Sequence, residues 1–470
     1  MRTRFTVTVP ALALALGVTT PAFAQAPSKP ATSAPAAAAE LPLPEVTDPM
    51  LAAVPPPKNV ISTWEEALVH VRARSVDLRN AYNEVRRAEG QWRSALAATL
   101  PTLTAQGAFN YNLITKDVTG FDSATLSTKT VQTPQTNVFS GTIALSQPLL
   151  AVATWHAIKT ASLNEDVTRM AAEDVKRNIA LGVSNALVAA VTAERVAELN
   201  RVGLRNALQR AELTERRRGL GAATALDVVR AQQDVTAARA TLVTGDESLR
   251  QAREALGIAL GYPEPYGVTR DLNLNALEES ARKACHPETA VESRADLQAA
   301  AGREKVAKRN VDNVYLQFIP TVDLRSNVTT TSQEQLFGPR TTWAIQGVLT
   351  VPLWEGGARY GALRQNRAVA DTAASNLEGL KRTATIQVTQ ARRGVEVAMQ
   401  TAKVAADARD QAAELDRLTR ASYQEGRGTS LELVVAASAL RQAEINFALR
   451  EFDVVKAKVL ALLALSSCPW

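Results

Sequence analysis

The sequence contains two copies of one long unit, and this duplication limits the possible folds more than any other feature. Four short segments of the first half recur in the same order in the second half. The pairs are Ser75–Leu78 with Arg294–Leu297, Leu100–Leu103 with Ile319–Val322, Gln147–Leu149 with Val351–Leu353, and Gly221–Asp227 with Gly426–Glu432. The spacing of the pairs is nearly constant, so we assign the copies to residues 59–262 and 291–465, with a linker at 263–290 and a tail at 466–470. Two long copies do not suit a solenoid, which stacks about three or more short repeats.

Each copy changes from a helical period to a strand period. Ser62 to Glu65 fits a capping box, so a helix is predicted from there to about Leu100, where Pro101 stops it. From Thr102 apolar and polar residues alternate, as in a strand with one apolar and one polar face.

The alternation predicts four strands, two in each copy. The apolar positions are Leu103, Ala105, Gly107, Phe109, Tyr111 and Leu113, then Phe139, Gly141, Ile143 and Leu145, then Val322, Leu324 and Val328, and finally Trp343, Ile345, Leu349 and Val351. We therefore expect β-hairpins at about 101–150 and 320–354, with polar loops at about 117–136 and 333–341.

The strands suit a lipid bilayer. Each is close to the roughly 9–11 residues that a tilted membrane strand needs. Their polar faces carry Asn, Gln, Asp and Arg, and aromatic residues such as Tyr111 and Trp343 bracket the apolar faces. Four strands cannot close a barrel, and open edges are not tolerated in lipid, so several chains would have to share one barrel. A soluble two-layer fold, with these strands packed on helices, remains the alternative.

A very long helix is expected after each hairpin, at about 151–218 and 358–425. Each would be on the order of 100 Å long. Small residues, mostly alanine, recur in both at heptad spacing. The helices would turn at tips at about 219–224 and 426–429, and shorter helices would return to about Leu260 and Leu465.

The N-terminus reads as an export signal followed by a tether. Arg2 and Arg4 precede a mostly apolar stretch, and Ala22–Ala24 fits an A-x-A cleavage site, which predicts a signal peptide at 1–24. An apolar helix of the mature fold is the alternative. Residues 25–58 are rich in Pro and Ala and predict an extended tether.

This arrangement resembles the TolC-like outer membrane efflux protein family, the outer membrane factors of efflux and type I secretion systems. The resemblance covers nearly all of residues 60–465. It rests on the doubled unit, on helix–Pro–strand at Leu100–Pro101 and Ile319–Pro320, on Val351–Arg359 at a strand exit, and on the tip at Tyr423–Gly426.

The resemblance implies a mainly α-helical chain with a membrane β-barrel. Three chains would form a twelve-stranded barrel in the outer membrane of a Gram-negative bacterium, continued by an α-helical tunnel into the periplasm. Such a homotrimer has no catalytic residues, cofactor or metal. It gives cargo an exit duct in tripartite efflux or type I secretion. Its partners would be a periplasmic adaptor (membrane fusion) protein and an inner-membrane pump of the RND or ABC type.

The resemblance also assigns candidate roles at the tips. Glu432 falls at an acidic gate position, Asp227 is its counterpart in the first copy, and Tyr423 falls at a gate tyrosine. A solvated carboxylate and a helix-packing tyrosine are the plainer alternatives. Adaptor contacts are expected at the tip residues Gly219, Leu220, Gly221, Gly426, Arg427 and Gly428.

Two cysteines exclude a disulfide-rich scaffold and a cysteine zinc cluster. Cys285 lies in the linker and Cys468 in the tail, segments that in this family wrap the waist of the tunnel. The two alternatives for these cysteines, a disulfide between them or two free thiols, both stay open.

Other classes of function fit less well. The formal net charge of +6 could suggest nucleic acid, but the basic residues alternate with acids along the helices, so we expect none. The common nucleotide-binding and hydrolase motifs are missing, so we expect no enzyme. A periplasmic adaptor would have one helical hairpin. A structural periplasmic coiled-coil protein without transport activity would explain the helices but not the four strands.

Overall fold

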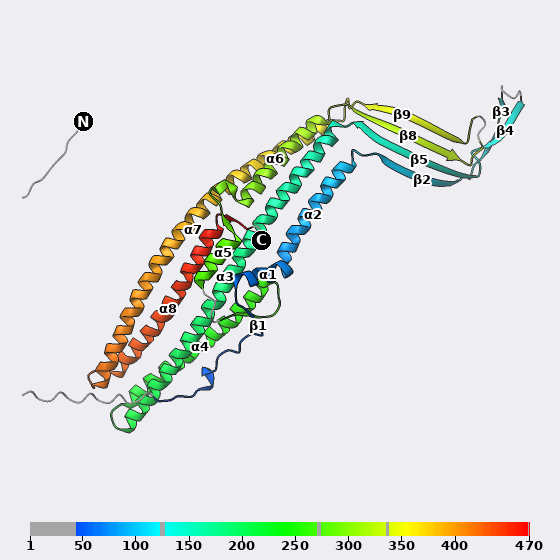
Figure 1. Cartoon of the computed structure of the whole chain (residues 1–470). Helices are drawn as coiled ribbons and strands as arrows, with labels where there is room; N and C mark the ends of the chain where they lie inside the picture. Colours follow the sequence, from blue (N-terminus) through cyan, green and yellow to red (C-terminus); the bar gives the residue numbers. More distant parts are fainter. Residues whose placement is uncertain (1–43, 123–126, 270–273, 335–337, 469) are drawn as a thin grey trace, which may run out of the picture. The chain divides into compact units, whose positions relative to one another are not determined.

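The computed structural model describes residues 44–122, 127–269, 274–334, 338–468 and 470, and residues 45–470 form one unit. The predicted signal peptide and residues 25–43 of the predicted tether lie outside the described residues. The fold is mainly helical, with long helices and strands as the sequence predicted (Figure 1).

The first copy is preceded by η1 (Pro49–Leu51) and begins with β1 (Asn59–Ile61). It then contains α1 (Trp64–Arg74), α2 (Val76–Ala97), β2 (Thr102–Tyr111), β3 (Lys116–Asp122), β4 (Ser127–Thr133), β5 (Asn137–Leu150), α3 (Val152–Gly219) and α4 (Ala225–Leu260). The linker contains β6 (Tyr266–Val268), α5 (Leu274–Ala284) and β7 (His286–Pro287). The second copy contains η2 (Val291–Ser293), α6 (Ala295–Leu316), β8 (Thr321–Thr331), β9 (Thr341–Thr350), α7 (Ala358–Gln424) and α8 (Ser430–Leu463), and the tail contains β10 (Ser466–Ser467).

The helix predicted from Ser62 to about Leu100 is two helices, and its cap is one residue later than predicted. Thr63 is the N-cap of α1 and accepts a hydrogen bond from the Glu66 N–H (3.2 Å), while Glu66 accepts one from the Ser62 N–H (2.9 Å). Ser75 then ends α1 and caps α2 by accepting from the Leu78 N–H (3.2 Å). A hydroxyl that can satisfy a free N–H starts a new helix even inside a helical pattern.

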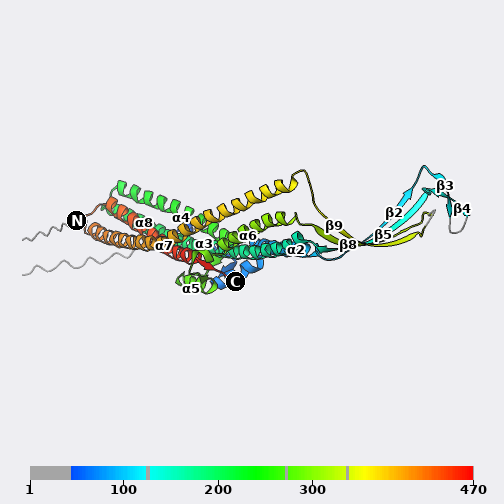
Figure 2. The same ribbon diagram turned by 90° about the horizontal axis from the view of Figure 1, so that it is seen from above.

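The four predicted strands form one antiparallel sheet in the order β2-β5-β8-β9, beyond the ends of α2, α3, α6 and α7 (Figures 1 and 2). Its register collects the predicted apolar positions on one face, because Leu103 lies opposite Leu145, Leu145 opposite Ser326, and Ser326 opposite Ile345. The other face has the row Thr102, Ser146, Arg325 and Gln346.

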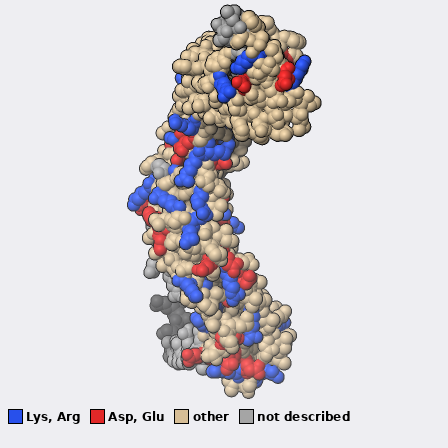
Figure 3. Space-filling model, turned by 90° about the vertical axis from the view of Figure 1, so that its right-hand side faces the viewer, with Lys and Arg blue, Asp and Glu red and all other residues tan. Residues whose placement is uncertain are grey.

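The apolar face is open in the single chain. Leu349 is 64% exposed and Trp343 is 72% exposed. Lys, Arg, Asp and Glu are sparse over the strands and dense over the helices (Figure 3). Within the described residues, β2 and β9 have no strand partner on their outer edges. The sheet therefore ends in two rows of unpaired backbone groups.

The first hairpin is longer than predicted. The expected polar loop at about 117–136 instead contains β3 and β4, which form a separate two-stranded antiparallel sheet. Thr119 and Thr130 lie opposite each other and their hydroxyls are 2.7 Å apart. Threonines favour strands although they are polar, and the apolar residues Val118, Phe121 and Val131 are too few to give the alternation that predicts a strand.

The long helices pack in two hairpins, α3 with α4 and α7 with α8. Helix α2 packs against α3, and α6 packs against both α3 and α7. The buried seam of α7 runs through Ala384, Ala391, Ala398 and Ala405 at heptad spacing, as predicted. Its small side chains let neighbouring helices approach closely. Among the described helices, α3 has an 18-residue window with mean hydropathy 1.4, enough by length and composition to cross a membrane, although 33% of it is buried.

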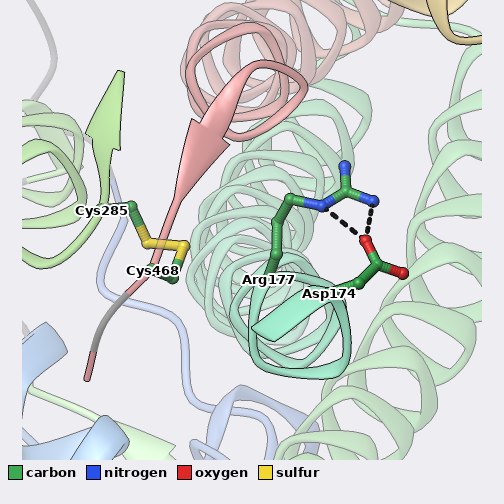
Figure 4. The surroundings of a disulfide bond; sticks show 4 residues. All are labelled: Asp174, Arg177, Cys285 and Cys468. Atoms are coloured by element: carbon green, nitrogen blue, oxygen red, sulfur yellow. Dashed lines mark hydrogen bonds and ion pairs between the residues drawn. A yellow bond between two sulfur atoms is a disulfide. The ribbon is translucent and has the colours of Figure 1, made fainter. Parts of the chain in front are cut away.

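The largest hydrophobic cluster lies where the linker and tail meet the helices. It contains Trp64, Leu187, Leu256, Val459 and Leu463, each at most 2% exposed. Cys285 and Cys468 belong to this cluster and are joined by a disulfide, beside the Arg177–Asp174 ion pair (Figure 4). Strands β7 and β10 pair next to the bridge. The tail is thus fixed covalently to the linker across a sequence separation of 183.

Replacing Cys285 with Ser is expected to lower the free energy of unfolding by about 2–5 kcal/mol, because the unfolded chain regains the freedom that a long closed loop removes. Denaturant unfolding of both proteins, with and without a reductant, measures the difference. The reductant should destabilise the wild type and leave the Cys285→Ser variant unchanged. Equal stability of the two proteins without reductant would contradict the prediction.

Candidate functional site

The two helical tips are built alike. Gly221 has φ +79°, and the Ala222 N–H donates to the Arg217 carbonyl (2.8 Å). Gly426 has φ +76°, and the Arg427 N–H donates to the Ser422 carbonyl (2.9 Å). Both glycines occupy the left-handed region that favours glycine at the end of a helix.

The remaining residues predicted at the tips lie close by. Gly219 is the last residue of α3, and Leu220 follows it with its side chain 83% exposed. Arg427 is exposed, and Gly428 is half-buried. A Cβ on Gly428 would lie 3.0 Å from the Tyr423 nitrogen, so the backbone is crowded there. The second tip is therefore a tight turn, while Leu220 gives the first tip an exposed apolar side chain.

Both predicted gate acids are N-terminal capping residues. Asp227 accepts hydrogen bonds from the Thr224 N–H (2.9 Å) and hydroxyl (2.7 Å), and the Asp227 N–H donates to the Thr224 hydroxyl. Glu432 accepts from the Thr429 N–H (2.8 Å), and its own N–H donates to the Thr429 hydroxyl. Each pair is a capping box that starts a return helix, α4 or α8. The two acids therefore have a structural role that the sequence comparison of the copies did not reveal.

The tips also contact each other, and here the two acids differ. The Ser430 hydroxyl, at the start of α8, donates a hydrogen bond to Asp227. The Arg217 guanidinium lies over the Tyr423 ring, 4.5 Å from its centroid. Glu432 is exposed, and its hydrogen bonds are to Thr429 in its own cap. Asp227 and Tyr423 thus join the first hairpin to the second, while Glu432 faces solvent.

Hydrogen bonding sets the protonation of Asp227. The bond from Ser430, and then those from Thr224, lower the pKa of this carboxyl below its usual value of 3.8. Because the folded-state pKa is lowered, the carboxylate stabilises the tip above the usual pKa. That stabilisation is lost as the pH falls through the lowered value.

A buried charged cluster lies further along the hairpins. Asp234 of α4 is 6% exposed and contacts Arg210 of α3 (2.5 Å) and Arg441 of α8 (3.7 Å). A Cβ on Gly203 would lie 2.5 Å from the Arg441 Cδ, so glycine leaves room for this arginine. Sequence reasoning missed the cluster, although charged residues and a glycine beside a small-residue seam were the available signal.

A second buried acid lies in the other hairpin. Asp416 of α7 is 4% exposed and pairs with Arg420 (2.6 Å). Burial, together with the charge of Asp416, raises the pKa of Glu444 on α8. The Asp234–Arg441 contact thus links α4 of the first hairpin to α8 of the second, while the Asp416–Arg420 pair lies within α7.

No group of three or more His, Cys, Asp or Glu that could hold a metal occurs in the part of the chain that the structure describes.

The chain matches the family model described as "Outer membrane efflux protein" at residues 67–262 and 286–465. The probable efflux pump outer membrane protein TtgC of Pseudomonas putida is 25% identical over 317 residues, which are 66% of this chain and 63% of TtgC. The chain thus spans less than two thirds of the length of this relative.

Two solved structures share the fold. A membrane protein from Pseudomonas aeruginosa has a TM-score of 0.71 and 22% identity, covering 88% of this chain and 99% of that protein. The outer membrane protein VceC of Vibrio cholerae has a TM-score of 0.69 and 18% identity, covering 85% and 95%.

Asp227→Asn and Glu432→Gln form a matched pair, since both remove one charge from a capping box. Asp227→Asn should speed hydrogen exchange at residues 225–232 and 430–433, because it weakens a cap and the bond from Ser430. The expected loss in the free energy of local unfolding of this cap is about 0.5–2 kcal/mol. Glu432→Gln should speed exchange only in the first turn of α8. Hydrogen exchange at pH 7, followed by mass spectrometry, measures both variants. If both variants speed exchange equally in the first hairpin, Asp227 does not join the two hairpins.

Proposed function

The chain belongs to the outer membrane efflux protein family, a family of channels rather than enzymes, and from this we propose that it is the outer-membrane channel of a tripartite efflux or type I secretion system. Its place would be the outer membrane of a Gram-negative bacterium, with the helices extending into the periplasm.

The sheet is the observation that carries this proposal. Four antiparallel strands collect their apolar side chains on one face, and the outer edges of β2 and β9 are open among the described residues. Lipid would leave these edge groups without hydrogen-bond partners. A homotrimer removes both edges, because β9 of each protomer can pair with β2 of the next to close a twelve-stranded barrel. The apolar face then contacts lipid, and the Arg325 face lines a wet lumen.

The helices support a tunnel below the barrel. Helix α3 follows β5 after one residue and α7 follows β9 after residues 351–357, and the heptad seam of small residues in α7 suits side-by-side packing with neighbouring helices. A structural coiled-coil protein without transport activity, the alternative function, would have no use for an apolar sheet face that is exposed in the single chain. The duct therefore accounts for both parts of the chain.

The tips are the proposed contact with the partners. Gly219, Leu220, Gly221, Gly426, Arg427 and Gly428 would meet a periplasmic adaptor protein, which joins the duct to an inner-membrane pump of the RND or ABC type. Leu220, at 83% exposed, is the apolar side chain available for such a contact.

The barrel is tested by placing charge on its two faces. The wild type should remain a trimer in mild detergent. Leu145→Arg and Leu349→Arg should prevent assembly, since each charge on the lipid face costs about 2–4 kcal/mol near the bilayer midplane. Thr142→Arg and Thr342→Arg, on the opposite face of the same strands, are the controls and should still assemble.

Native mass measurement and cross-linking of the detergent-solubilised proteins give the result. A monomeric wild type, or normal assembly of both leucine variants, would reject the shared barrel and favour the soluble two-layer fold.

The gate is tested at Glu432. We infer that three copies of this exposed carboxylate lie close together at the closed tip and favour cations. Glu432→Gln should then lower cation selectivity in planar-bilayer recordings and weaken block by multivalent cations. Val435→Asp, which adds an acid about one turn away, should do the reverse. If the channel forms and the selectivity of Glu432→Gln equals that of the wild type, Glu432 is a cap residue only.

A further inference from the structure

An extended N-terminal segment lies along the first helical hairpin. This strap, residues 45–61, runs beside α4 and ends in β1 (Figure 1). Residues 45–58 of the strap belong to the segment that the sequence predicts as a tether. A free tether would make few contacts with the body of the protein, whereas this segment is anchored at both ends.

The first anchor joins the strap to α4. Asp48 pairs with Arg239 (2.7 Å), and the side chain of Asp48 is 6% exposed. Asp48 also accepts a hydrogen bond from the Met50 N–H (2.8 Å), which fixes the turn of η1. Arg239 is 45% exposed, so the ion pair lies at the surface, but two hydrogen bonds hold the Asp48 side chain in a defined orientation.

Apolar contacts extend the first anchor. Met50 and Leu51 pack against the cluster of Leu204, Ala207, Val235, Ala238 and Leu242. This cluster is the seam between α3 and α4. The strap thus covers the line along which the two helices of the hairpin meet.

The second anchor lies further from the tip. Arg253 of α4 is 7% exposed and donates a hydrogen bond to the Pro55 carbonyl (2.9 Å). Pro57 lies close to Gly267, where a Cβ would come within 2.5 Å of the Pro57 Cγ. Strand β1 then pairs in parallel with β6. A strap held at both ends resists separation of the helices beneath it.

The second hairpin has no matching strap among the described residues. The segment before α6, which contains β7 and η2, pairs with β10 and contacts α7 and α6 near the disulfide. Three apolar side chains of α7 nearer the tip, Val404, Leu415 and Leu418, are each more than half exposed. The two hairpins therefore have the same arrangement of helices, but among the described residues only the first is covered by a strap.

We propose that the strap is a brace for the first hairpin, and that it holds Asp227 in place for its contact with Ser430 of the second hairpin. It keeps α3 and α4 in register where Leu204 meets Leu242. Arg239 lies about 18 Å along the continuous helix α4 from Asp227. Release of the strap would loosen the helix that presents Asp227 to Ser430, while the packing within the second hairpin stays unchanged.

The test is charge reversal with rescue. Arg239→Asp places two carboxylates against each other and should release the strap. Hydrogen exchange of the full-length protein in detergent should become about tenfold faster at residues 204–211 and 235–242, and faster at 225–232. The double variant Asp48→Arg/Arg239→Asp restores an ion pair of opposite polarity and should recover most of the protection.

The matched control is Arg417→Asp, which reverses a charge of a surface ion pair on α7. It should leave exchange in the first hairpin unchanged. Unchanged exchange in Arg239→Asp, equal loosening of both hairpins, or no recovery in the double variant would overturn the brace. Because exchange reads the helices directly, a failure of the transport proposal would not alter this result.

Discussion

The backbone groups of an unpaired strand edge cannot find hydrogen-bond partners in lipid, and the rest of the molecule depends on this constraint. The sheet has an apolar face that suits lipid, yet β2 and β9 are edges within the described residues. In the proposed homotrimer, pairing between protomers would satisfy both requirements at once. It would also fix the number of long helices below the barrel, because the β2–β5 hairpin leads into α3 and the β8–β9 hairpin leads into α7.

Close helix packing follows from the same geometry. Helices that continue the proposed barrel would stand side by side, so each would have to fit against its neighbours without a thick core. Alanine at heptad positions allows this, and it also has the highest helix propensity. Large apolar residues gather instead around Trp64 and Leu260, where the linker, the tail and both copies meet. The chain thus combines lean packing along the helices with one dense core.

The sequence predicted the features that depend on periodicity. Heptad spacing located α7, and strict alternation placed Leu145 and Ser146 on opposite faces of the sheet. Features that depend on local polar competition were wrong or missed. Thr63 rather than Ser62 caps α1. Both residues carry a hydroxyl that can cap a helix, so the sequence pattern did not distinguish them. The β3–β4 pair is mostly polar, with one apolar pair of Val118 and Val131, and so has no sustained hydrophobic period.

The site was harder to predict than the fold. Matching the two copies aligned Asp227 with Glu432, and both are indeed capping residues. Only the structure distinguishes them, because the bond from Ser430 to Asp227 joins residues that lie far apart in the sequence. The Asp234 cluster was missed for the same reason. A charged residue at a helix seam has no local signature of its partners on other helices.

The disulfide has a consequence for the order of events during biogenesis. The bond from Cys285 to Cys468 closes a covalent ring that contains all of the second copy. In the exported chain that we propose, the ring would form only after residue 468 has left the reducing cytoplasm, so oxidation would follow export of the second copy. A chain arrested before that point keeps Cys285 as a free thiol. The bridge therefore distinguishes fully delivered chains from incomplete ones and makes late oxidation a step of maturation.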